Sequence, residues 1–578
     1  MPKLEVLLAD PGVRHVATPA VTWFLTGCSE AGAARLARDG GDGDRLEPEL
    51  CAQAGDASII KIVHDGGRAA RVAAWRGPTS KHDVFWLKTG AGDLILADHF
   101  RNAIARVPPA DRAPGDDALA DHFLFRAPSG DASYCRRIKR LEPGTRIAID
   151  VASGTLTQSL FHRMDEPPVR RGFDAYLDDV ETAFTDTLGP YRSHPDIANF
   201  FSGGVDSTLL QAYLGPATPA LNLIVDERDA AATMEAGYAE RAADALEIPL
   251  VRQQVHRSDF LRDFEAATEK TGMPIFNGSL AVFDRLFTNP HGIYVCGMSA
   301  DSLFGHAALF HRVASWFANP AALWCLRLLT PLVARKDLAR HNVWRERVEQ
   351  LLPNAQQLAA PTLDSDGYAA RAETYAEFAL AEAVFGAETI KKRLESRLAQ
   401  VLDHVVLSAP ERSNFARHLE IGSWIELFGD DYSTQMRHLA IAAGKRLLLP
   451  YIAGAVVRSA LRIPTEERYV RGFEGKPIPK GLLKRHLPAY PTNQRKGHTL
   501  LAPFPQYYAR GPLQGIWEDY GVPDCIATSS VKDRLLAAPF RLTYNALSYA
   551  VWSRHVRDNA ALDSLPGTQR YDWPSAAG

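Results

Sequence analysis

The stretch Phe200-Phe201-Ser202-Gly203-Gly204-Val205-Asp206-Ser207-Thr208 decides the fold of this chain. The apolar run 197–201 predicts a short buried strand, and residues 207–214 predict a helix that Gly215-Pro216 ends. Two glycines and two hydroxyl groups between a strand and a helix N-terminus favour an anion, because backbone N–H groups and the helix dipole face it. Asp206 would repel a phosphate there unless a cation lay between them. The stretch therefore predicts a site for Mg²⁺-bound phosphate.

Strands and helices alternate around this stretch. We expect further strands over 221–225, 250–255 and 293–296, and helices over 173–188, 231–246 and 258–271. This order predicts an α/β domain with a parallel sheet, whose ligands bind beyond the C-terminal ends of the strands. The loop 296–305 reaches the same edge. Asp301 should therefore lie beside Asp206, where two carboxylates can share Mg²⁺ ions.

The two ends of the chain differ in pattern. Residues 1–165 predict a β-rich, sandwich-like domain, because short apolar runs at 58–63, 83–87, 93–97 and 145–149 are separated by Gly, Asp and Pro. Within it, residues 39–48 predict an exposed loop. Residues 166–578 form the second predicted domain, which is mostly helical from 305 to about 460.

Bulk composition excludes several classes of protein. The chain has 578 residues, 46% of them hydrophobic and 23% charged, and a net charge of −3, which argues against a nucleic-acid binder. Its six cysteines form no CxxC pair, so a zinc ribbon or a redox motif is not expected. We find no apolar segment long enough for a membrane span and no apolar signal core at the N-terminus. These features predict a cytoplasmic protein with reduced thiols.

Three motifs resemble those of a known family. Ser-Gly-Gly-x-Asp-Ser at 202–207 resembles the PP-loop of ATP pyrophosphatases, which cleave ATP between the α and β phosphates. The second motif is similar to that of the asparagine synthetase family in Gly297, Ala300, Asp301, Leu303, Phe304 and Gly305. A third, basic segment runs from Lys480 to Gly497 and includes Arg495-Lys496. The resemblance covers roughly residues 170–505.

The resemblance implies ATP and Mg²⁺ as ligands and assigns a set of site residues. Asp206 and Asp301 would hold the metal, and Lys496 would contact the α-phosphate and stabilise charge at the reacting carbonyl. These three residues are the implied catalytic set. The implied nucleotide-binding residues are Ser202, Gly203, Gly204, Asp206, Ser207, Thr208, Val225, Asp226, Gly297 and Lys496.

The chain departs from the family at two places. Glutamine-dependent members carry the nucleophilic cysteine at position 2, where this chain has Pro2, and no cysteine precedes Cys28. We therefore expect the N-terminal domain to be a degenerate class II glutamine amidotransferase-like scaffold. Met298 stands where asparagine synthetases have Glu and β-lactam synthetases have Tyr, and it cannot transfer a proton. His306 and Glu426 are nearby candidates for that role.

These departures favour a lasso peptide cyclase, a family member that joins an amine and a carboxylate of one peptide into a macrolactam. Residues 93–126 also resemble such cyclases. The expected reaction is adenylation of an Asp or Glu side chain and attack by the N-terminal amine, releasing AMP and pyrophosphate. Expected partners are the precursor peptide and, in its maturation, a leader peptidase and a leader-binding protein. A β-lactam synthetase-like or other small-molecule amide synthetase stays an alternative, as does a non-catalytic nucleotide-binding protein. A tRNA-modifying PP-loop enzyme is opposed by the charge balance and the cysteine spacing.

Overall fold

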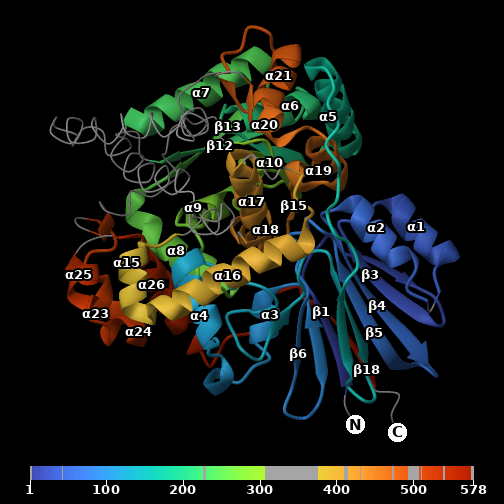
Figure 1. The fold of residues 1–578 in the computed structure, drawn as a ribbon, viewed down its shortest axis with the longest axis vertical. Helices are drawn as coiled ribbons and strands as arrows, with labels where there is room; N and C mark the ends of the chain where they lie inside the picture. The colour runs from blue at the N-terminus through green and yellow to red at the C-terminus, as the bar shows by residue number, and fades with distance from the viewer. Residues whose placement is uncertain are drawn as a thin grey trace.

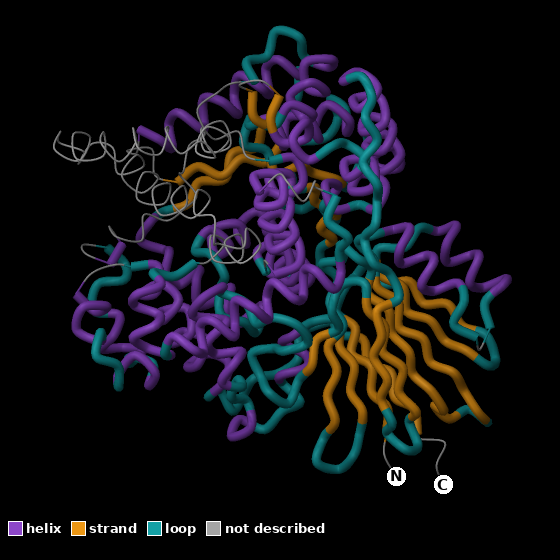
Figure 2. The backbone as a smooth tube through the Cα atoms, viewed as in Figure 1, coloured by secondary structure: helices purple, strands orange, loops and turns teal. Residues whose placement is uncertain are grey.

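The computed structural model describes residues 3–41, 43–225, 230–305, 375–408, 414–429, 431–471, 474–492, 507–508, 511–537 and 540–574. Figure 1 shows a β-rich part built from the start of the chain, a parallel sheet with its helices, and a group of helices beside them. Figure 2 shows that nearly all the long strands belong to the β-rich part. Among the described helices, none combines the length and apolar character needed to cross a membrane.

The parallel sheet that the sequence predicts is confirmed. Its order is β13-β12-β11-β14-β15, and every neighbouring pair is parallel. All four residues of β11 are buried, as expected of a central parallel strand with both faces covered. The strands are β11 (Ile197–Phe200), β12 (Ala220–Val225), β13 (Leu250–Val255), β14 (Ile293–Val295) and β15 (Arg446–Leu448).

Two groups of helices pack around this sheet. The first comprises α5 (Phe173–Leu188), α6 (Val205–Leu214), α19 (Gly454–Leu461) and α21 (Pro477–His486). The second comprises α8 (Phe260–Thr271), α9 (Ser279–Phe283) and α18 (Tyr432–Ala442). Further helices of this part are α7 (Ala230–Leu246), α10 (Ala300–Phe304), α17 (Asn414–Gly429) and α20 (Thr465–Tyr469). A two-stranded hairpin, β16 (Val470–Arg471) and β17 (Glu474–Gly475), precedes α21.

The N-terminal part is a sandwich of two sheets. Leu4 and Leu96 of one sheet share a buried cluster with Phe24, Ile60 and Val72 of the other. The first sheet has the order β18-β1-β7-β6-β8, and the second β10-β9-β5-β4-β3-β2. Its strands are β1 (Lys3–Leu8), β2 (Arg14–Ala17), β3 (Val21–Thr26), β4 (Ser58–Asp65), β5 (Arg68–Arg76), β6 (Phe85–Lys88), β7 (Leu94–Ala97), β8 (Lys139–Arg140), β9 (Thr145–Asp150), β10 (Leu156–Leu160) and β18 (Gln569–Pro574). Its helices are α1 (Glu30–Asp39), α2 (Leu46–Ala54), α3 (Phe100–Ile104) and α4 (Asp116–Phe125).

The last strand of the chain completes the first sheet. β18 pairs antiparallel with β1, from Lys3 opposite Pro574 to Leu8 opposite Gln569. The rings of Tyr571 and Trp573 lie 4.7 and 6.2 Å from that of Phe24, between centroids. Figure 1 accordingly places the N and C labels side by side. No signal in the sequence pointed to this pairing.

The remaining described helices form a group beside the sandwich (Figure 1). They are α15 (Phe378–Phe385), α16 (Ala387–His404), α23 (Ile516–Tyr520), α24 (Asp524–Ala527), α25 (Lys532–Ala537) and α26 (Arg541–Trp552). Arg393 of α16 forms a bidentate ion pair with buried Asp121 of α4, with both N–O distances 2.7 Å. The predicted helical region 305–460 is largely helical where it is described, and residues 306–374 lie outside the described residues.

Buried ion pairs join the sandwich to the parallel-sheet part. Arg437 of α18 donates to both carboxylate oxygens of Asp56, at 2.8 and 2.6 Å. Burial alone would raise the pKa of Asp56, but Arg437 holds that pKa at about 2. Arg140 of β8 likewise contacts Asp431 at 2.7 Å and Asp83 at 2.8 Å. The two parts are thus fixed to each other by paired charges that are largely shielded from water.

The predicted exposed loop 39–48 is wrong in its second half. Helix α2 begins at Leu46, and Glu47 is only 1% exposed. Its Oε1 accepts a hydrogen bond from the Trp23 indole at 2.8 Å and lies 2.9 Å from the ammonium of Lys61. Because Lys61 is fully buried in β4, it requires a buried carboxylate beside it, and this segment supplies one.

Candidate active site

The loop between β11 and α6 is a tight glycine turn that leads into the N-terminus of a helix. Gly203 adopts φ +68°, and a Cβ on it would lie 2.3 Å from the carbonyl carbon of Tyr238 in α7. Only glycine fits this position, because the loop is pressed against another backbone in a left-handed conformation. The hydroxyl of Tyr490 donates to the Gly203 carbonyl at 2.6 Å, which fixes the loop from the other side.

The two loop serines hold the turn together. The amide of Ser202 donates to Ser207 Oγ at 3.1 Å, and the amide of Gly204 donates to Ser202 Oγ at 3.2 Å. Ser202, Gly203, Gly204 and Ser207 therefore all lie in one turn at the N-terminus of α6. Thr208 is fully buried, and its Oγ1 has no hydrogen-bond partner among the described residues.

The second predicted loop packs directly on the first. A Cβ on Gly297 would lie 3.3 Å from Asp206 Cβ, so the two loops pack closely against each other there. β11 and β14 are neighbours with Asn199 opposite Val295, which brings both loops to the same edge of the sheet. Ser299, at φ +64°, turns the chain into α10 and so places Asp301 in the first turn of that helix.

Asp206 and Asp301 come together around one cation. The ammonium of Lys476 lies 2.6 Å from Asp206 Oδ2 and 2.5 Å from Asp301 Oδ1. Only 4% of the Lys476 side chain is exposed. Burial by itself would lower the pKa of Lys476, but the two carboxylates raise that pKa above its ordinary value. The ammonium is therefore charged over the whole physiological pH range.

The carboxylates fit a divalent cation. Asp206 Oδ1 is buried and has no hydrogen-bond partner among the described residues, although buried carboxylate oxygens are normally bonded. Carboxylate oxygens are the protein ligands that Mg²⁺ prefers, and the phosphates of a nucleotide supply the others. An acceptor without a donor, next to a second carboxylate, is the arrangement that a bound cation would complete.

The sequence offers Glu426 and His306 as candidates for proton transfer near this pair. Glu426 of α17 accepts a hydrogen bond from Ser302 Oγ at 2.6 Å. Glu426 therefore lies against the loop that carries Asp301. Met298 packs partly buried against the apolar core of this part. His306 lies outside the described residues.

The remaining predicted residues have the following places. Val225 is the last residue of β12 and so lies at the same sheet edge as the PP-loop. Asp226 and Lys496 fall outside the described residues. Lys480 is buried one helical turn after Lys476, with its ammonium 3.7 Å from Glu474.

Sequence reasoning missed Lys476, the residue that joins the two carboxylates. It follows the β16–β17 hairpin in a Gly475-Lys476-Pro477 turn, and its φ of +62° is unusual for a side chain other than glycine. The proline that starts α21 was a visible signal for a helix start, but nothing in the turn indicated where the lysine would point.

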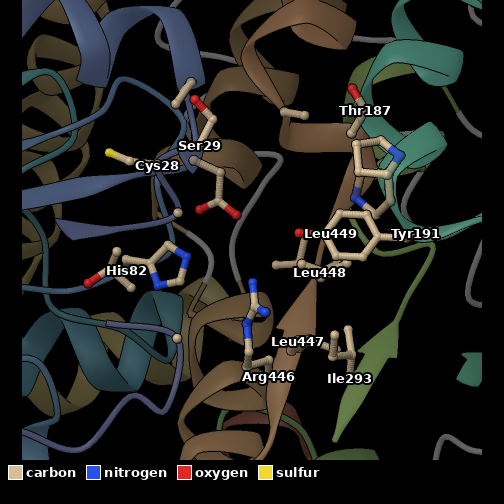
Figure 3. A pocket seen from close by; sticks show the side chains of 18 of the residues that line it. Cys28, Ser29, His82, Thr187, Tyr191, Ile293, Arg446, Leu447, Leu448 and Leu449 are labelled. Carbon is tan, nitrogen blue, oxygen red and sulfur yellow. The ribbon is translucent and has the colours of Figure 1, made fainter. Parts of the chain in front are cut away.

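A separate cavity of about 750 Å³ lies between the sandwich and the parallel-sheet part (Figure 3). Ile293 and Arg446, the first residues of β14 and β15, lie on one side, and Cys28 and His82 of the sandwich lie on the other. Since strands start at this edge, the cavity is at the end of the sheet opposite to the PP-loop. Burial raises the pKa of Cys28 to about 12, so its thiol is not an activated nucleophile.

Comparison with known proteins agrees with these motifs. The family model for asparagine synthase matches residues 190–538, which is more than half of the chain. The match contains the PP-loop, the loop with Asp301, and Lys476. No curated protein matches the chain significantly.

Proposed function

Because the chain belongs to the asparagine synthase family, we propose that it closes a macrolactam ring in a precursor peptide, as lasso peptide cyclases do. The family indicates ATP-dependent amide bond formation, and the AMP-forming course and the peptide substrate are our proposal. The observation that supports it best is the meeting of Asp206 and Asp301 at the carboxyl edge of adjoining parallel strands. Ligands of open parallel sheets bind at this edge.

The proposed reaction has two steps. A side-chain carboxylate oxygen of the peptide attacks the α-phosphorus of ATP, and pyrophosphate leaves, which gives an acyl-AMP mixed anhydride. The N-terminal amine of the same peptide then attacks the acyl carbon and loses a proton, and AMP leaves as the amide bond forms. Holding both groups in one pocket removes the entropy cost of bringing them together, which is worth on the order of 7–11 kcal/mol.

The site residues have the following proposed roles. The turn with Ser202, Gly203, Gly204 and Ser207, at the N-terminus of α6, binds the phosphates that become pyrophosphate. Asp206 and Asp301 hold Mg²⁺, which offsets phosphate charge when bound. Lys496 stabilises charge at the α-phosphate and at the acyl carbon. Thr208, Val225, Asp226 and Gly297 complete the proposed nucleotide site.

The source of the amine supports an intramolecular reaction. Pro2 stands where glutamine-dependent members carry the nucleophilic cysteine, and burial raises the pKa of the Cys28 thiol, so neither of these two positions supplies an activated thiol for glutamine hydrolysis. We propose that the sandwich is a degenerate amidotransferase-like scaffold, which the buried Asp56–Arg437 pair fixes to the synthetase part. The peptide itself then brings the amine. A leader peptidase and a leader-binding protein would prepare that peptide.

The attacking amine must lose a proton to an acceptor in the site. Met298 has no acid–base group, and Glu426 is a carboxylate that contacts the Asp301 loop, through Ser302. We propose Glu426 as the group that accepts the amine proton, in place of the polar residue that relatives have at position 298.

The test is product analysis with purified protein, Mg-ATP and peptides encoded beside its gene. The proposal expects AMP, pyrophosphate and a peptide lighter by one water. AMP formed only with small amino acids would instead indicate a β-lactam synthetase-like enzyme. No nucleotide turnover with any substrate would favour a non-catalytic nucleotide-binding protein.

Two variants check the metal assignment in the same assay. We expect Asp206→Ala and Asp301→Ala to abolish AMP formation, because each removes one of the two proposed metal ligands. Circular dichroism of both variants should match that of the wild type. Turnover that survives in either folded variant would exclude the assignment.

A further inference from the structure

Lys476 occupies the centre of the proposed metal site. Its ammonium contacts one oxygen of Asp206 and one oxygen of Asp301, at 2.6 and 2.5 Å. Its side chain is almost wholly shielded from solvent. A divalent ion shared by these carboxylates would need the same space between the same oxygens, so the ammonium and the ion cannot both lie there.

The backbone of Lys476 is held in place, whereas its side chain is long and has several rotatable bonds. The Lys476 amide donates to the Tyr469 carbonyl at 3.0 Å, and Pro477 starts α21 directly after it. Since proline restricts its own φ, the turn is held on both sides. The four-carbon stem of a lysine can still rotate its ammonium to another acceptor. Phosphates bound at the N-terminus of α6, where Asp206 lies, would be within reach.

The charges favour exchange of the ammonium for a divalent ion. Lys476 places one positive charge between the two carboxylates. A divalent ion in the same place would supply two positive charges. A nucleotide would add phosphate oxygens that can accept the displaced ammonium.

We infer that Lys476 is the resident cation of the nucleotide-free site, and that it yields its place to the divalent ion and moves to the polyphosphate when the nucleotide enters. This inference rests on the proposed ATP-dependent function. Metal binding would then depend on the nucleotide. The ion alone must compete with the ammonium of Lys476, whereas a bound nucleotide offers that ammonium another acceptor. Lys476 therefore acts as a positioning residue that keeps the two carboxylates together before substrate binds.

The experiment measures Mn²⁺ binding by the loss of the free-ion EPR signal, with and without α,β-methylene-ATP, which cannot be cleaved between the α and β phosphates. Each loss is taken relative to a protein-free sample with the same analogue, because the analogue itself binds Mn²⁺. The full-length wild type is compared with Lys476→Met and Lys476→Gln. Lys391→Met is the matched control, because it removes one positive charge from an exposed site on α16. Circular dichroism verifies that each variant is folded.

Without nucleotide, the wild type and Lys391→Met should bind Mn²⁺ weakly, and both Lys476 variants should bind it at least about tenfold more tightly, since the competing cation is gone. With the analogue, the wild type should bind Mn²⁺ as well. Folded Lys476 variants that gain no affinity would overturn the inference. Tight binding of Mn²⁺ by the wild type without nucleotide would also overturn the inference. This second result does not depend on whether the variants fold.

Failure of the proposed function gives a different pattern. In that case the wild type would take up no more Mn²⁺ with the analogue than without it, while the gain in the Lys476 variants would persist. The two conclusions are therefore read from separate arms of one experiment.

Discussion

At the scale of one residue, the PP-loop depends on the absence of a side chain at Gly203. We predict that Gly203→Ala destabilises the protein by about 1–3 kcal/mol or more and weakens binding of α,β-methylene-ATP, because its Cβ would lie 2.3 Å from the Tyr238 carbonyl carbon at φ +68°. Thermal unfolding and calorimetric titration measure the two effects. Gly204→Ala is the control for stability. Its φ is −74°, and the nearest atom to a new Cβ is Ser202 Oγ at 3.2 Å. Equal destabilisation by both variants would contradict this account.

The buried carboxyl group of Asp98 should make the stability of the protein depend on pH. It is 7% exposed, and burial raises its pKa to about 7, although the amides of Ala9 and Asp10 donate to it at 2.8 and 2.9 Å. The folded state therefore holds the proton more tightly than the unfolded state, whose pKa is 3.8. This contribution is complete below the unfolded pKa and is lost as the pH rises to about 7, by about 4 kcal/mol in total.

The variant Asp98→Asn isolates this effect, because its neutral amide does not titrate. In urea unfolding between pH 4.5 and 7.5, the wild type should lose stability relative to Asp98→Asn as the pH rises. A difference between the two proteins that stays constant across this range would refute the assignment to Asp98.

The sequence allowed the positions of those site residues to be predicted that directly follow a strand. Asp206 and Asp301 come after two strands of one parallel sheet, and parallel strands end at a common edge, so their proximity followed from chain order. Lys476 reaches the same point from a turn between a hairpin and a helix. Its direction depends on the packing of α21 against α5 and α6, which no local pattern encodes.

At the scale of elements, the link between α18 and the sandwich can be tested through Asp56 and Arg437. We predict that Arg437→Met costs about 3–5 kcal/mol in urea unfolding, because it leaves the Asp56 carboxylate, whose side chain is only 12% exposed, without its charged partner. The double variant Asp56→Leu/Arg437→Met should recover much of that loss, since neither charge is then buried.

A surface pair provides the comparison. Arg485 of α21 contacts Asp178 and Glu181 of α5 at 2.7 Å, but its side chain is 31% exposed. Arg485→Met should therefore change the free energy of unfolding by less than about 1 kcal/mol. A similar cost for Arg437→Met would show that the Asp56 pair contributes no more than a solvated one.

Element boundaries were predictable where the sequence carries a strong stop. Helix α5 and strand β13 have the predicted bounds, 173–188 and 250–255. The helix predicted over 258–271 begins instead with a 3₁₀ turn at Arg257–Asp259, and α8 starts at Phe260. The exposed loop predicted over 39–48 was wrong at Glu47, because the Gly- and Asp-rich composition gives no sign of the buried Lys61 on a distant strand.

At the scale of the whole molecule, β18 ties the end of the chain to its first strand. We predict that the double variant Tyr571→Ala/Trp573→Ala destabilises the sandwich by about 2 kcal/mol, because both rings pack on Phe24. Amide hydrogen exchange should accelerate in residues 3–8, which pair with β18. Exchange in β11 and β14 should change less. Equal acceleration in both sheets would show that the effect is global.

The pairing of Lys3 with Pro574 also has a consequence for synthesis on the ribosome. The ribosome makes β1 before all the residues that separate it from β18, so at about 5–20 residues per second β1 waits roughly half a minute to two minutes for its partner. During that time the nascent sandwich presents an open strand edge, which invites pairing with other chains. Yield of the folded protein should therefore depend on how the cell shields that edge while the rest of the chain is being made.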